Sequence, residues 1–351
     1  MVLVDDTITA NHAIELARQG VGLLWNGDYQ NARALLQAIS RRLDRKPRVG
    51  SQKVLTSPAE IFTSYREGLG IKAQITGSLL IPLSSDFEIQ LRRGQDAKDA
   101  CLEVIGAVTE PIVMPLKILL ALVSAHEWRK KKIKLTQLPK PITPYFGVFS
   151  PVRGEYIDLI LKIDNTKNQS VAFDIGVGSG VLSILLAQKG YQKIIATDIE
   201  PKAMACAQEN INNYGLQDRI TLLQTDVFPE GKADVIVCNP PWIPATPSSP
   251  IESAIFDPNS QFLKKFLLGL KDHLEEDGQG WLIISDIAEH LQLRSRADLL
   301  QWFKEAGLKV EKKMDTLPKH SKVKDTEDIL HFAREKEVTS LWVLIKDNSS
   351  F

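Results

Sequence analysis

The stretch Val-Ala-Phe-Asp-Ile-Gly-Val-Gly-Ser-Gly, residues 171–180, decides the fold of this chain. Three apolar residues lead into Asp174. Glycines then follow at alternate positions, namely Gly176, Gly178 and Gly180. Residues 181–189 show the apolar spacing of a helix, and Gly190 is typical of a helix C-cap. A strand, a glycine-rich turn and a helix in this order predict a nucleotide site at the start of a doubly wound sheet.

The spacing of the glycines distinguishes between ligands. The dinucleotide fingerprint is Gly-x-Gly-x-x-Gly, and its third glycine would fall at Val181. Here the pattern is Asp-x-Gly-x-Gly-x-Gly, in which the absence of Cβ atoms lets a ligand approach the backbone. This variant resembles the first motif of class I S-adenosylmethionine (AdoMet) methyltransferases. The resemblance implies AdoMet binding at Asp174, Gly176, Val177, Gly178 and Gly180.

Strands and helices alternate after residue 145, which predicts a mostly parallel sheet with helices on both faces. Apolar segments near 194–197, 220–223, 235–238, 281–285, 308–312 and 341–345 are the expected strands. The resemblance implies the seven-stranded, Rossmann-like sheet of class I methyltransferases. Three prolines between residues 138 and 144 exclude a regular helix there and indicate a linker. We therefore expect two domains, 1–145 and 146–351.

The N-terminal domain is expected to be smaller, α-rich or α+β, and to recognise the substrate. Residues 11–45 are predicted to be helical with a break at 26–28, and residues 112–125 to form a buried helix. Residues 1–145 hold 20 Lys and Arg against 14 Asp and Glu, so their net charge is 20 − 14 = +6. The rest of the chain holds 23 against 29, which gives −6. This asymmetry favours an anionic partner for the first domain.

Two acidic residues follow the second and third strands of the predicted sheet. Asp198 ends the second strand, where its carboxylate can accept hydrogen bonds from the two hydroxyls of a ribose. Asp226 follows the third strand, where a carboxylate can accept from an adenine amine. Ile199 and Val227, the apolar residues that follow them, complete the expected cofactor site. Parallel strands present these residues at one edge of the sheet.

Asn239-Pro240-Pro241-Trp242 directly follows the fourth strand and is the sharpest motif in the chain. The two prolines end the strand and stiffen the turn. The tetrapeptide resembles the (Asn/Asp)-Pro-Pro-aromatic motif of methyltransferases that act on planar nitrogen. That resemblance implies that the Asn239 side-chain oxygen and the Pro240 carbonyl accept the two N–H bonds of the target. Trp242 offers a flat face for stacking, and Asn239 also borders the cofactor.

Within the class, the chain is most similar to small-domain methyltransferases, which include the HemK-type release-factor glutamine methyltransferases and ribosomal RNA guanine methyltransferases. One departure precedes the first strand. The HemK group carries Pro-Arg-Pro-x-(Thr/Ser)-Glu, whereas this chain has Ser-Pro-Val-Arg-Gly-Glu at 150–155, where Arg153 and Glu155 are the candidates for pocket closure. The substrate is therefore either an exocyclic base amine in RNA, with a ribosomal component as partner, or a protein glutamine, as in a release factor. The charge of the first domain favours RNA.

A different class of function is a non-catalytic AdoMet- or RNA-binding module. The intact Asn-Pro-Pro-Trp motif argues against it, because a binder needs no clamp for a target nitrogen. The three cysteines have neither metal-ligand spacing nor a disulfide pattern, so we expect a cytoplasmic protein that needs no metal. The apolar run at 112–125 is too short to span a bilayer, and no membrane partner is expected.

Overall fold

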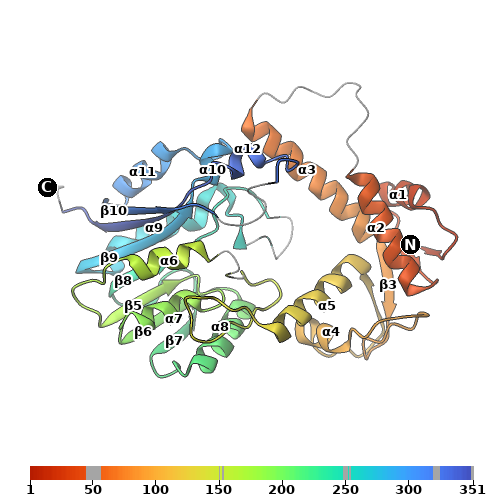
Figure 1. The fold of residues 1–351 in the computed structure, drawn as a ribbon, viewed down its shortest axis with the longest axis horizontal. Helices are drawn as coiled ribbons and strands as arrows, with labels where there is room; N and C mark the ends of the chain where they lie inside the picture. Colours follow the sequence, from red (N-terminus) through yellow and green to blue (C-terminus); the bar gives the residue numbers. More distant parts are fainter. Residues whose placement is uncertain are drawn as a thin grey trace. The chain divides into compact units, whose positions relative to one another are not determined.

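The computed structural model describes residues 1–44, 57–149, 151, 154–247, 252, 254–318 and 325–348 (Figure 1). The chain divides into two compact units: Met1–Thr56 with Phe62–Lys131, and Ser57–Ile61 with Lys132–Phe351. The second unit resumes at Lys132, before the domain boundary expected at residue 145. The segment between these positions contains an isolated antiparallel bridge of Ile133 with Ile142. A substrate-recognition role for the first unit stays a prediction. No described helix is long and apolar enough to cross a membrane.

The first unit contains a four-stranded sheet in the order β1-β2-β3-β4. Its strands are β1 (Val2–Val4), β2 (Leu23–Trp25), β3 (Leu79–Leu83) and β4 (Ile112–Pro115). The first three strands run parallel, and β4 pairs antiparallel with β3. The accompanying helices are α1 (Ala10–Arg18), α2 (Tyr29–Leu43), α3 (Pro58–Gly77), α4 (Lys98–Ile105) and α5 (Leu116–Lys131), and α3 belongs to this unit from Phe62 onward.

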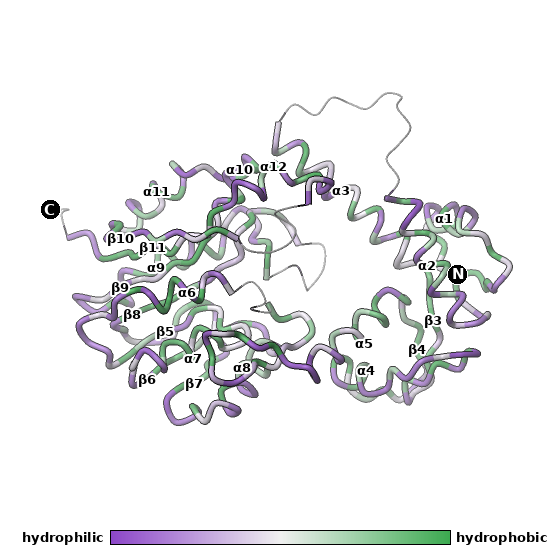
Figure 2. Tube along the Cα trace, viewed as in Figure 1, coloured by the Kyte–Doolittle hydropathy of each residue, from purple (hydrophilic) through white to green (hydrophobic). Residues whose placement is uncertain are grey.

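Two helix predictions in the first unit are wrong in part. Residues 112–115 form β4, and the helix α5 begins only at Leu116. Residues 23–25, which were expected within a helical stretch, form β2. Short apolar runs have no periodicity that separates a buried strand from a buried helix, so pairing with β3 decided both cases. Figure 2 shows α5 as hydrophobic along most of its length and hydrophilic at its C-terminal end.

The second unit contains a seven-stranded sheet in the order β10-β11-β9-β8-β5-β6-β7. Its strands are β5 (Val171–Ile175), β6 (Lys193–Asp198), β7 (Ile220–Gln224), β8 (Ala233–Cys238), β9 (Leu274–Ser285), β10 (Leu308–Thr316) and β11 (Thr339–Lys346). The strands β5 to β9 are mutually parallel, and β11 runs antiparallel to both β9 and β10. The predicted mostly parallel, seven-stranded sheet is confirmed.

Helices cover both faces of this sheet. Successive strand residues point to opposite sides, and here buried apolar side chains lie on both sides. Ala172 packs in one apolar layer with α6 (Glu155–Lys162), α7 (Val181–Gln188) and α8 (Pro201–Tyr214). Phe173, the next residue of β5, packs in the other layer with α9 (Gln261–His273) and α11 (Arg296–Glu305). Further short helices among the described residues are Pro258–Ser260, α10 (Ile287–His290) and α12 (His331–Arg334).

The strand order places the predicted motifs at one edge of the sheet. The strand β5 lies between β6 and β8, so the chain leaves it toward one side and later returns to the other. This is the topological switch point at which open α/β sheets bind ligands, beyond the carboxyl ends of the strands. The residues that follow β5, β6, β7 and β8 therefore form the candidate site.

Candidate active site

The glycine-rich loop after β5 is fastened to the end of β6. The backbone N–H groups of Gly176 and Val177 both donate to the Thr197 carbonyl, at 2.9 and 2.8 Å. Gly176, Gly178 and Gly180 have φ angles of +78°, +50° and +81°. A Cβ placed on Gly178 would meet only the Gly176 carbonyl oxygen, at 3.9 Å. The protein therefore leaves open the space that a ligand needs against this loop.

Asp174 lies fully buried in β5, just before the loop. Its Oδ2 accepts a 2.5 Å hydrogen bond from the Ser183 hydroxyl in α7. Its Oδ1 is also buried and has no hydrogen-bond partner among the described residues. Burial raises the pKa of this carboxyl to about 7. A buried carboxylate oxygen without a donor fits a ligand that brings a cationic or N–H group, as the amino end of AdoMet does.

Asp198, the last residue of β6, joins the second strand end to the glycine loop. Its Oδ2 accepts from the Gly178 N–H at 3.1 Å, and its Oδ1 accepts from the Glu200 N–H at 3.0 Å. Burial raises the pKa of this partly buried carboxyl. Each oxygen retains a lone pair, so the carboxylate can still accept from the hydroxyls of a ribose. Ile199 beside it is 61% exposed, which leaves an apolar side chain available at this edge.

The segment after β7 is anchored through its backbone. Val227 is buried and has φ +70°, a conformation that is strained for a β-branched residue and is typical of functional sites. Its carbonyl accepts a 2.6 Å hydrogen bond from the Thr197 hydroxyl, which connects β6 to this turn. Asp226 is exposed and forms an ion pair with Lys265 of α9. Its expected contact with an adenine amine stays a prediction.

The Asn-Pro-Pro-Trp turn follows β8 and contains a hydrogen bond that the sequence did not predict. The Trp242 indole Nε1–H donates to Asn239 Oδ1 at 3.0 Å. Pro240 is buried, and the partly buried Trp242 ring packs against both apolar layers of the unit. No donor contacts the Pro240 carbonyl in the part of the chain that the structure describes. Both oxygens expected to hold the target nitrogen therefore have accepting capacity left.

Several residues that hold the loops of the candidate site in place were not predicted from the sequence. Asn210 of α8 is buried and donates from Nδ2 to the carbonyls of Ser179 and Thr143, both at 3.0 Å, while its Oδ1 accepts from the Thr143 N–H at 2.8 Å. It thereby ties the glycine loop to the segment before α6. The other supporting residues are Ser183, Thr197, Asp257 and Arg294.

A sequence signal existed for two of these residues. Ser183 is a polar residue within an apolar helical run, and Asp257 precedes a helix where an acid is a typical cap. The carboxylate of Asp257 accepts from the N–H groups of Phe262 and Leu263, both at 3.0 Å. Of the two candidates for pocket closure, Glu155 is the first residue of α6, and Arg153 lies outside the described residues.

The mostly parallel, seven-stranded sheet and the glycine loop at its switch point agree with the class I AdoMet-dependent methyltransferase that the sequence motifs imply. A family model described as ribosomal protein L11 methyltransferase matches residues 157–243. Over 174 residues the chain is 32% identical to a candidate protein N5-glutamine methyltransferase of Methanocaldococcus jannaschii, which covers 47% of this chain and 82% of the relative. The chain therefore belongs to the HemK-like family of AdoMet-dependent methyltransferases.

Other relatives share shorter segments with this chain. A release factor glutamine methyltransferase of Rhodopirellula baltica is 31% identical over 133 residues, covering 36% of this chain and 43% of the relative. A ribosomal protein uL3 glutamine methyltransferase of Bordetella pertussis is 43% identical over 76 residues, covering 20% of this chain and 26% of the relative. The chain thus matches less than half the length of these two bacterial relatives.

Proposed function

We propose that this enzyme methylates the side-chain amide nitrogen of a glutamine in a protein of the translation machinery. The names of three relatives support this substrate, because each names glutamine and two name a release factor or a ribosomal protein. The observation that carries the proposal is the Asn239 side chain, oriented by the Trp242 N–H at the end of β8. The strand β8 pairs directly with β5, which leads into the glycine loop.

The chemistry of an amide explains why this turn is needed. An amide nitrogen delocalises its lone pair into the carbonyl group and is a poor nucleophile. Asn239 Oδ1 and the Pro240 carbonyl would accept the two N–H bonds, which orients the nitrogen and favours a localised lone pair. AdoMet, when bound, supplies a methyl group that its sulfonium already activates. Positioning and fixed dipoles are then expected to provide most of the rate enhancement.

The hydrogen bond from Trp242 orients the Asn239 side chain before the target binds, which lowers the cost of reorganisation during the reaction. The indole N–H can donate only to an acceptor, so it directs Oδ1, and not the amide NH2 group, toward Trp242. Since Oδ1 has a second lone pair, the same atom can accept from the target without rotation of the side chain. A dipole that is oriented before the reaction costs no reorganisation when charge develops on the nitrogen.

A base amine in RNA is the second candidate substrate, and the charge of +6 on residues 1–145 favours it. An incubation of purified enzyme with labelled AdoMet and a lysate that lacks the enzyme distinguishes the two substrates, because the label enters either protein or RNA. We expect label in protein, at a glutamine identified by mass spectrometry of the labelled peptide. Label confined to RNA would refute the glutamine proposal.

The Asn239→Ala variant tests the role of the turn with the substrate found in this way. Loss of one preorganised polar group predicts a fall in turnover of about a hundredfold or more. Asn213→Ala, which changes an exposed asparagine of α8, is the matched control and should keep the wild-type rate. A wild-type rate for Asn239→Ala would mean that the motif is only a rigid turn.

A further inference from the structure

Arg294 lies between α10 and α11 and is 5% exposed. Its Nη1 donates to the Trp242 carbonyl and its Nη2 to the Ser285 carbonyl, each at 3.4 Å. Its buried Nε has no hydrogen-bond partner, and no carboxylate lies within 4.0 Å of its guanidinium, in the ranges that the structure describes. Burial lowers the pKa of Arg294, and the Glu289 and Asp257 carboxylates favour its charged form.

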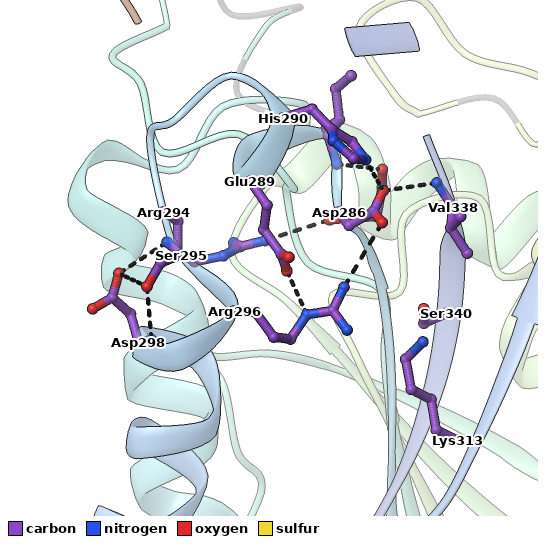
Figure 3. Close-up of polar contacts among 12 residues, drawn as sticks. Asp286, Glu289, His290, Arg294, Ser295, Arg296, Asp298, Lys313, Val338 and Ser340 are labelled. Atoms are coloured by element: carbon purple, nitrogen blue, oxygen red, sulfur yellow. Dashed lines mark hydrogen bonds and ion pairs between the residues drawn. The ribbon is translucent and has the colours of Figure 1, made fainter. Parts of the chain in front are cut away.

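The residues on either side of Arg294 are anchored by hydrogen bonds and ion pairs. Ser295 and Asp298 form a capping box that fixes the start of α11. Arg296 donates to Glu289 at 2.7 Å and lies 3.7 Å from Asp286. Asp286 in turn accepts from the Val338 N–H at 2.7 Å, next to the start of β11. Figure 3 shows Arg294 beside Glu289 within this network, which lies where β9 ends.

The contacts of Arg294 form a continuous path to the candidate reacting position. The Ser285 carbonyl at the end of β9 binds Arg294, Arg294 binds the Trp242 carbonyl, and the Trp242 indole binds Asn239 Oδ1. An apolar side chain of similar length would fill the same space with a smaller desolvation cost. What the guanidinium adds is a pair of directed hydrogen bonds across the ends of two adjacent parallel strands.

We propose that Arg294 is a positioning residue that sets the orientation of Trp242 and, through it, of the Asn239 side-chain oxygen. This inference rests on the proposed function of Asn239, whose side-chain oxygen accepts an N–H bond of the target amide. The Asn239–Trp242 turn lies between β8 and the isolated bridge of Ile243 with Phe256, and among the described residues no backbone N–H is the hydrogen-bond partner of the Trp242 carbonyl. Arg294 supplies that partner at Trp242. Since misplacement of a reacting group by about 1 Å can cost roughly a hundredfold in rate, loss of this contact should act on turnover.

The experiment compares Arg294→Met and Arg294→Lys with a matched control, Arg219→Met. Arg219 also donates to two backbone carbonyls, those of Ala187 and Tyr191, and its buried Nε likewise has no hydrogen-bond partner among the described residues. It stands directly before β7, at the edge of the sheet opposite the candidate site. Each variant is assayed for kcat, KM of the methyl acceptor, AdoMet affinity and thermal unfolding.

We expect Arg294→Met to lower kcat about 10- to 100-fold, while KM and the AdoMet Kd change less than about threefold. Arg294→Lys, which keeps a charged donor nitrogen but loses the two-nitrogen fork, should recover part of the lost kcat. Arg219→Met should lower the melting temperature and leave kcat unchanged. If Arg294→Met does not fold, the kcat of Arg294→Lys relative to wild type decides the question. An unchanged kcat in a folded Arg294 variant overturns the proposal.

Two further variants separate this proposal from the one on which it rests. A wild-type rate for Asn239→Ala would refute the proposal that Asn239 holds the target amide, whatever the effect of the Arg294 variants. Loss of activity in Asn239→Ala together with a wild-type kcat in the Arg294 variants would refute only the positioning role of Arg294. In a Trp242→Phe background, which lacks the indole N–H, Arg294→Lys should have a smaller effect on kcat than in wild type. Equal effects in both backgrounds would contradict the path through Trp242.

Discussion

Gly178 offers the most direct test of the cofactor loop. With φ +50° it has a left-handed backbone, which costs an L-residue with a Cβ about 1–2 kcal/mol. The added Cβ of alanine would meet no protein atom closer than 3.9 Å, so no steric clash adds to that cost. Gly215, the C-cap of α8, has φ +69° and nothing within 4 Å of its ideal Cβ, so Gly215→Ala carries the same penalty away from the loop.

The two substitutions should therefore match in stability and differ in ligand binding. Urea unfolding should show a loss of about 1–2 kcal/mol for both Gly178→Ala and Gly215→Ala. Calorimetry with AdoMet should show wild-type affinity for Gly215→Ala and a loss of tenfold or more, about 1.4 kcal/mol, for Gly178→Ala. Gly178→Asp, which adds a negative charge, should abolish binding in a folded protein. Unchanged AdoMet affinity in a folded Gly178→Asp variant would refute the assignment of the loop.

The remaining predictions concern three buried or partly buried polar residues. Asp198→Ala should weaken AdoMet binding by about 1.5–3 kcal/mol in calorimetry, the range for hydrogen bonds to a charged group, whereas Asp198→Asn, which keeps an acceptor, should lose less. The pKa of Asp174 is about 7 in the folded chain against about 3.9 when unfolded, so its contribution to stability is complete below pH 4 and is lost as pH rises to 7. Urea midpoints between pH 4 and pH 7 should therefore fall more steeply for wild type than for Asp174→Asn, and parallel curves would contradict this. Asn210→Ala removes the three buried hydrogen bonds to the backbone of Thr143 and Ser179 and should lower the free energy of unfolding by about 3 kcal/mol or more. A loss below about 1 kcal/mol in urea unfolding would contradict its role in joining the glycine loop to the segment before α6.

Residues 171–180 and the alternating segments after them were enough to predict the mostly parallel sheet of the second unit and the helices on both of its faces. The strand, the glycines and the helix are encoded by neighbours in the sequence, and alternation of strands with helices leaves few possible topologies. The strand ends that carry Asp198, Asp226 and Asn239 could be placed at one edge for the same reason. The first unit lacked such a pattern. Its strands have three to five residues and pair with segments as far as 56 positions away, such as Leu23 with Leu79.

Only the tertiary structure decided which side chains support the candidate site. Asn210 reaches Thr143 across 67 positions, and Arg294 reaches Trp242 across 52. Such partners leave no periodicity in the sequence, because they depend on where two distant elements meet after packing. The bond between Trp242 and Asn239 spans only three residues, yet it depends on the side-chain rotation that the surrounding apolar layers permit. Local spacing determines which elements form and which edge they share, whereas the orientation of polar groups at that edge is set by contacts that exist only once the core has closed.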